Sequence, residues 1–128
     1  MKKYKTVYKT GAFDPFHYGH LNIFKKAKEI CEYLIVGVST DQLIEENKKR
    51  KAFMPLEHRM LIISELKCVD KVIPQMDKNK QKIVSQLNVD AIVVGSDWKG
   101  KYPPVTCDMI YFDYTNYISS SYLRKKIK

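Results

Sequence analysis

The stretch that decides the fold stands near the start of the chain and reads Gly11-Ala-Phe-Asp-Pro-Phe-His-Tyr-Gly-His20. It follows a short strand-like run that begins at Thr6, and it leads into a segment with helical periodicity over about residues 19–32. Gly11 permits a turn directly after the strand, and Gly19 lets a backbone or a ligand approach the start of the helix. The stretch therefore predicts a strand, a loop and a helix in close succession.

Outward from this stretch, short apolar runs alternate with helix-period segments along the chain. We expect further strands over residues 33–38, 69–73, 91–94 and 108–112, and helices over 55–66, over 77–88 and after a cap at Ser119. This order predicts an α/β fold, a Rossmann-like doubly wound sheet of about five parallel strands with helices on both faces. The length of 128 residues predicts a single domain, residues 1–128.

The composition indicates what kind of molecule the protein binds and in which cellular compartment it works. The 23 Lys and Arg residues exceed the 14 Asp and Glu residues, and the net charge of +9 indicates an anionic partner: nucleic acid, a membrane surface or a phosphate-rich small molecule. No apolar run approaches the ~18–20 residues of a membrane span, and no leader segment follows Met1. Cys31, Cys68 and Cys107 are far apart, which predicts neither disulfides nor zinc and favours the cytoplasm.

Two histidines carry the chemical signal of the opening stretch. His17 and His20 are three residues apart, so at a helix start they project toward one side. Free N–H groups at such a start suit a phosphate, and two imidazoles there could stabilise charge that builds on a phosphoryl group. A metal site is one alternative, although no third ligand is placed to complete it. A purely capping or core role is the other.

Gly11-Ala-Phe-Asp-Pro-Phe-His-Tyr-Gly-His20 resembles the HxGH signature of the nucleotidyltransferase superfamily, in the form of the cytidylyltransferase family. The resemblance covers almost the whole chain and extends to the following segments: Val38-Ser-Thr-Asp41, Lys48-Lys-Arg-Lys51, Glu57-His-Arg59, Val69-Asp-Lys-Val-Ile-Pro74, Gly95-Ser-Asp-Trp-Lys-Gly-Lys101 and Ile118-Ser-Ser-Ser121. It implies transfer of a cytidylyl group from CTP to a small phosphorylated alcohol of the glycerol 3-phosphate kind, which gives a CDP-alcohol and pyrophosphate. It further implies Mg²⁺ bound with CTP, a homodimer and no nucleic-acid partner.

The resemblance also implies roles for individual residues. Catalytic roles fall on His17, His20, Lys48 and Arg59. Nucleotide binding falls on Thr10, Gly11, Ala12, Phe13, Asp14, Gly19, Gly95, Asp97, Tyr114, Ile118, Ser119 and Ser120, and substrate binding on Arg50, Lys51 and Trp98. No side chain is expected to bind metal directly, and Asp14 is expected to organise the first loop or to contact the metal indirectly.

Two departures from the family pattern leave alternatives open. The family usually reads Arg-Thr-Glu-Gly-Ile-Ser-Thr before the last helix, whereas here Tyr114 replaces the arginine and Tyr117 the glycine; Ala12 also replaces a threonine. An adenylyltransferase that uses ATP on a phosphorylated substrate therefore remains an alternative to the CTP enzyme. A basic nucleic-acid-binding module is a third reading, which is disfavoured because the lysines are spread along the chain rather than striped.

Overall fold

The computed structural model describes residues 3–76, 79–95, 105–112 and 120–127, and the sequence-based predictions at other positions lie outside it. The elements follow in the order β1 (Tyr4–Gly11), α1 (Tyr18–Glu29), β2 (Cys31–Ser39), α2 (Asp41–Lys48), α3 (Leu56–Ser64), β3 (Lys71–Gln75), α4 (Lys80–Leu87), β4 (Ala91–Gly95), β5 (Asp108–Phe112) and α5 (Ser120–Ile127).

The five strands form one sheet in the order β3-β2-β1-β4-β5, and every pairing within it is parallel. The chain builds outward from β1 to β3 and then returns to place β4 on the other side of β1. Strand order therefore reverses at β1, and in open sheets of this kind ligands bind beyond the carboxyl ends of the strands at such a point. The loop that follows β1 occupies this position.

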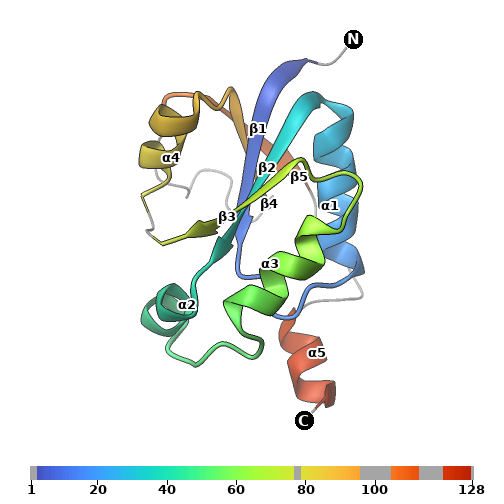
Figure 1. Cartoon of the computed structure of the whole chain (residues 1–128), viewed down its shortest axis with the longest axis vertical. Coiled ribbons are helices and arrows are strands. Elements are labelled where there is room, and N and C mark those ends of the chain that lie inside the picture. Colours follow the sequence, from blue (N-terminus) through green and yellow to red (C-terminus); the bar gives the residue numbers. More distant parts are fainter. Residues whose placement is uncertain (1–2, 77–78, 96–104, 113–119, 128) are drawn as a thin grey trace.

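Helices cover both faces of the sheet, as the sequence predicted (Figure 1). The larger core cluster joins Phe24 of α1 and Ile63 of α3 to the buried valines of β1 and β2. On the opposite face, α4 supplies Ile83 and Val84 to two smaller clusters. Alternate residues of each strand face the two layers, which is why the strands read as continuous apolar runs in the sequence.

Tyr8 ties three strands together within the smaller layer. Its side chain is fully buried, and its hydroxyl donates a hydrogen bond to the side-chain oxygen of Gln75 on β3. The ring passes over Gly37 of β2, where an added Cβ would lie only 1.9 Å from the tyrosine hydroxyl. Burial raises the pKa of Tyr8 to about 12, so the hydroxyl remains a neutral donor. Glycine at position 37 is therefore a steric requirement of this contact.

The structure corrects several predicted boundaries. Helix α1 ends at Glu29 rather than residue 32, because the backbone of Ile30 already bonds to Tyr4 and Cys31 begins the pairing of β2 with β1. Strand β3 runs two residues later than predicted and includes Pro74, which an edge strand tolerates because only one side is paired. Helix α4 begins at Lys80 rather than residue 77, and α3 ends at Ser64 rather than residue 66.

Helix α2 was not predicted. The Thr40 hydroxyl accepts a hydrogen bond from the backbone N–H of Leu43, which caps the helix, and Lys49 ends it in a left-handed conformation. The helix has only two buried side chains, Leu43 and Ile44, so its apolar periodicity is too short to stand out in the sequence. The first residue of the basic Lys48-Lys-Arg-Lys51 segment therefore lies at the end of a helix.

Candidate active site

The loop after β1 is held in shape by a buried aromatic ring. Phe13 adopts a positive φ of 51° and is almost fully buried, with its ring over Gly11. A Cβ at Gly11 would lie 2.9 Å from that ring, so glycine is required at the point where the strand turns into the loop. The Phe13 ring also meets the imidazole of His20 edge-on, at 4.9 Å between centroids. The loop conformation thus holds one of the two predicted histidines in place.

His17 and His20 form the start of α1 and bond to each other's backbone. His17 is the N-cap, and its Nδ1 accepts from the N–H of Gly19 at 3.0 Å. The Nδ1 of His20 accepts from the N–H of His17 at 3.2 Å, and the two rings stack with centroids 3.8 Å apart. A neutral ring whose Nδ1 accepts must carry its proton on Nε2. Each histidine therefore has an Nε2–H available to a ligand.

Both imidazoles are held in the neutral form. Burial, followed by the charges of His17 and Lys9, lowers the pKa of His20 to about 2. Burial also lowers the pKa of His17. Because neither ring carries a charge near pH 7, the pair acts on a phosphate as two hydrogen-bond donors rather than as two cations.

Asp14 is the centre of the hydrogen bonding around the loop. Its carboxylate is fully buried, and it accepts from Arg50 at 2.9 Å, from the N–H of Phe53 at 2.7 Å and from the N–H of Met54 at 2.7 Å. Burial disfavours the charged form, but these donors outweigh it and hold the pKa of the Asp14 carboxyl below its usual value. These three bonds show that Asp14 organises the loop after β1.

A group of cations surrounds the same loop. Arg124 of α5 donates to the carbonyl oxygen of Asp14 at 2.6 Å, and Ser120 donates to that of Pro15 at 2.9 Å. Burial, followed by the charges of Arg50 and Arg124, lowers the pKa of Lys48. The mutual repulsion of these three cations is relieved when an anion binds among them. The loop, α2 and α5 together therefore form a site suited to a polyanion.

Arg59, which was predicted to be catalytic, lies under the loop after β1. Its side chain is completely buried, and its guanidinium donates to the carbonyl oxygens of Met54, Ala12 and Ser39 at 2.8, 2.9 and 2.7 Å. A fourth bond joins it to the carboxylate of Asp41. Without a ligand the Arg59 guanidinium thus joins three segments, because three inward-facing carbonyls require a buried donor with this many N–H groups. Its predicted contact with phosphate stays a prediction.

The structure brings together most of the described residues that were predicted for the site. Thr10, Gly11, Ala12, Phe13, Asp14, His17, Gly19 and His20 lie along the end of β1 and the start of α1, and Lys48, Arg50, Lys51 and Ser120 belong to the segments that border this loop. Gly95 ends the neighbouring strand β4. Asp97, Trp98, Tyr114, Ile118 and Ser119 lie outside the described residues.

Sequence reasoning missed Arg124 and the structural use of Asp41. Arg124 stands four residues after Ser120, and that spacing places both on one side of α5. Asp41 begins α2 directly after the Thr40 cap, where its partner Arg59 is 18 residues away in sequence. The first could have been found from helical spacing, whereas the second depends on tertiary contact.

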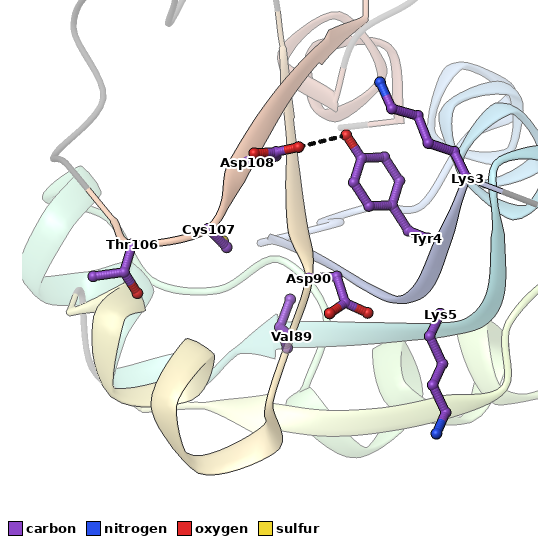
Figure 2. Close-up of a pocket in the computed structure, with 8 residues that line it drawn as sticks. All are labelled: Lys3, Tyr4, Lys5, Val89, Asp90, Thr106, Cys107 and Asp108. Carbon is purple, nitrogen blue, oxygen red and sulfur yellow. Dashed lines mark hydrogen bonds between the residues drawn. The ribbon is translucent and has the colours of Figure 1, made fainter.

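A separate hollow lies at the opposite, amino-terminal edge of the sheet (Figure 2). It is lined by Lys3, Tyr4, Lys5, Val89, Asp90, Thr106, Cys107 and Asp108. The Tyr4 hydroxyl donates to Asp108 at 2.9 Å, and Asp90 accepts from the N–H of Thr6 at 2.9 Å. These bonds join the starts of β1, β4 and β5. The carboxylates of this hollow are thus part of the sheet's framework and lie far from the histidine pair.

The parallel sheet with reversed strand order at β1 and the histidine pair at the start of α1 agree with the nucleotidyltransferase fold and site that the sequence resembles. Comparison with known proteins identifies the family: the Cytidylyltransferase-like family model matches residues 8–126. The chain belongs to this family, and it is a nucleotidyltransferase.

Two curated relatives match over nearly their full length. The chain is 36% identical to glycerol-3-phosphate cytidylyltransferase of Bacillus subtilis, across 96% of this chain and 97% of the relative. It is 38% identical to the protein of the same name from Bacillus spizizenii, across 94% and 95% of the two chains. A solved structure, the lipopolysaccharide core biosynthesis protein from Thermoplasma volcanium, superposes with a TM-score of 0.73 at 26% identity, over 88% of this chain and 98% of that one.

The Asp14 contacts predict that Asp14→Asn loosens the segment after α2. The amide group would present an NH₂ to at least one of the N–H donors now bound, and the charge attraction to Arg50 would be lost. We expect trypsin to cleave after Arg50 or Lys51 faster in the variant, as measured by mass spectrometry under native conditions. Glu46→Gln, an exposed change in α2, is the matched control. Equal cleavage rates in both variants would contradict the role given to Asp14.

The low pKa of His20 predicts a pH-dependent stability. Between pH ~2 and ~6.5 the unfolded chain binds a proton at this residue and the folded chain does not, so the free energy of unfolding rises with pH across that window. The slope is at most about 1.4 kcal/mol per pH unit for one histidine. Urea unfolding at about pH 5 and about pH 7.5 should show a smaller pH effect in His20→Gln than in the wild type. An unchanged pH effect in the variant would show that His20 titrates normally.

Proposed function

We propose that this protein transfers a cytidylyl group from CTP to a small phosphorylated alcohol of the glycerol 3-phosphate kind. The observation that carries the proposal is the stacked pair of neutral histidines beyond β1, bordered by Lys48, Arg50 and Arg124. The near-full-length similarity to glycerol-3-phosphate cytidylyltransferases supports the choice of nucleotide and acceptor. Family membership also favours an enzyme over a nucleic-acid-binding module.

In the proposed reaction, a phosphate oxygen of the acceptor forms a bond to the α-phosphorus of the nucleotide. The bond from that phosphorus to the bridging oxygen of the β-phosphate breaks, and its electron pair leaves with pyrophosphate. The acceptor oxygen is already ionised near pH 7, so no protein base is required. The protein positions two anions and stabilises the charge that develops between them.

The two histidines serve this reaction as donors. Their Nδ1 atoms are fixed by backbone N–H groups, so each Nε2–H has a set direction before substrate binds. The cations around Asp14 neutralise the remaining phosphate charge. Asp14 and Arg59 hold the segments that carry these groups.

We propose that Mg²⁺ enters with the triphosphate. Magnesium commonly binds through substrate phosphates with few protein ligands. Among the described residues no cluster of three His, Cys, Asp or Glu side chains is suited to a metal ion, and the Asp14 oxygens are taken by N–H donors. The metal would therefore be held by the phosphates of the nucleotide, where it would neutralise part of their charge.

We also propose a homodimer in a reducing compartment. Leu61 and Ile62 on α3 are 61% and 40% exposed, an apolar surface suited to a second copy of the chain. The three cysteines are free thiols, which is consistent with the cytoplasm. In the part of the chain that the structure describes, no helix has both the length and the apolarity to cross a membrane. Sedimentation equilibrium measures the oligomeric state directly.

The nucleotide assignment predicts that the purified protein releases pyrophosphate from CTP when glycerol 3-phosphate or a similar phosphorylated alcohol is supplied. ATP should be a poorer substrate, because a site with polar groups matched to cytosine leaves some unpaired when adenine binds. A coupled pyrophosphate assay with each nucleotide and a panel of acceptors measures this. Release from ATP alone would replace the cytidylyl assignment by adenylyl transfer.

The role of the histidines predicts that His17→Asn lowers kcat by roughly 10²–10³ without a matching loss of stability. Asparagine is among the best N-cap residues, so the variant keeps the cap while it loses the Nε2–H donor. Steady-state kinetics and thermal unfolding measure the two effects separately. His58→Asn, at an exposed position on α3, is the control. Retained turnover in a folded His17→Asn protein would assign His17 to capping alone.

A further inference from the structure

Lys9 is a charged residue whose neighbours across the sheet are buried core valines. It lies in the central strand β1, where its Cα partners are Val36 of β2 and Val93 of β4. Both valines are fully buried and belong to the core cluster beneath α1. Directly paired residues of neighbouring strands face the same side of a sheet, so the Lys9 side chain begins between these two valines.

The strand register indicates where the nearest polar region lies for the Lys9 ammonium. A lysine in such a position packs its aliphatic stem against apolar neighbours and extends its charged end toward the nearest polar region. On the same face, Val7 and the core lie toward the amino end of β1, whereas Gly11, which has no side chain, lies toward the carboxyl end. The Phe13 ring and the His20 imidazole stand beyond Gly11. The charge of Lys9 also lowers the pKa of His20, which is consistent with an ammonium near that ring.

We propose that Lys9 is a phosphate-binding residue of the transfer site, and that it reaches the phosphoryl group held by His17 and His20 from the sheet side. This inference rests on the proposed function. The two histidines are neutral and can donate hydrogen bonds but cannot balance charge. Lys48, Arg50 and Arg124 approach from the segments around Asp14. Lys9 adds a positive charge next to the histidines, in a partly buried position where Coulomb attraction is stronger than in water.

Lys9→Gln is the direct test, with Lys5→Gln as its matched control. Lys5 lies on the same strand and the same face, but it is exposed at the amino-terminal edge. We expect Lys9→Gln to lower kcat/KM for the nucleotide roughly 10- to 100-fold, the usual contribution of one charge-assisted hydrogen bond. Lys5→Gln should leave it unchanged, and Lys9→Arg should recover part of the loss. A Lys9→Gln protein that melts at a lower temperature but keeps kcat/KM would overturn the proposal and assign Lys9 to the fold.

A labelling experiment on the wild-type protein decides the question if Lys9→Gln does not fold. Amine acylation at Lys9 and Lys5 is followed by mass spectrometry with no ligand, with CTP, with ATP and with inorganic pyrophosphate. We expect ligand to slow acylation of Lys9 and to leave Lys5 unchanged. Protection by ATP and pyrophosphate but not by CTP would support Lys9 while overturning the proposed nucleotide. An enzyme that is active on CTP but shows no protection of Lys9 by any ligand would overturn the Lys9 proposal alone.

Discussion

A buried carboxylate sets the arrangement of this site. Asp14 has no solvent exposure, and an ionised group in that position is tolerated only when N–H donors surround it. Arg50, Phe53 and Met54 supply those donors, so the connection after α2 must fold onto the loop after β1. The carbonyl group of the same residue receives Arg124 of α5. One residue thereby joins three segments that are remote in sequence.

Arg59 complements Asp14 with the opposite charge. The guanidinium collects carbonyl oxygens from the ends of β1 and β2 and from Met54, and it pairs with Asp41 at the start of α2. Met54 takes part in both arrangements, because its N–H bonds to Asp14 and its carbonyl bonds to Arg59. The two buried charges therefore support each other through one short stretch of backbone, and they hold the site residues on a rigid frame.

In this site, different residues supply the directed hydrogen bonds and the positive charge. Burial keeps His17 and His20 neutral and hence available as directed donors, while lysine and arginine side chains carry the positive charge. Donors that are oriented before the reaction need no rearrangement as charge develops on a phosphoryl group, and that is the condition for efficient electrostatic catalysis. The stacked rings are fixed by backbone contacts at a helix start, so folding alone creates this orientation.

The sequence by itself determined the α/β class, the parallel sheet, the helices on both faces and the family, because strand runs, helical periodicity and the stretch from Gly11 to His20 are local signals. It also placed the two histidines on one side of α1, since a spacing of three residues in a helix has a fixed geometry. Only the tertiary structure decided the contacts of Arg59 and Asp14 and the position of Lys9 between two core valines. The local sequence around an arginine does not reveal whether its side chain is buried against backbone carbonyls or exposed to a phosphate. That depends on which distant carbonyls and carboxylates reach the side chain after folding.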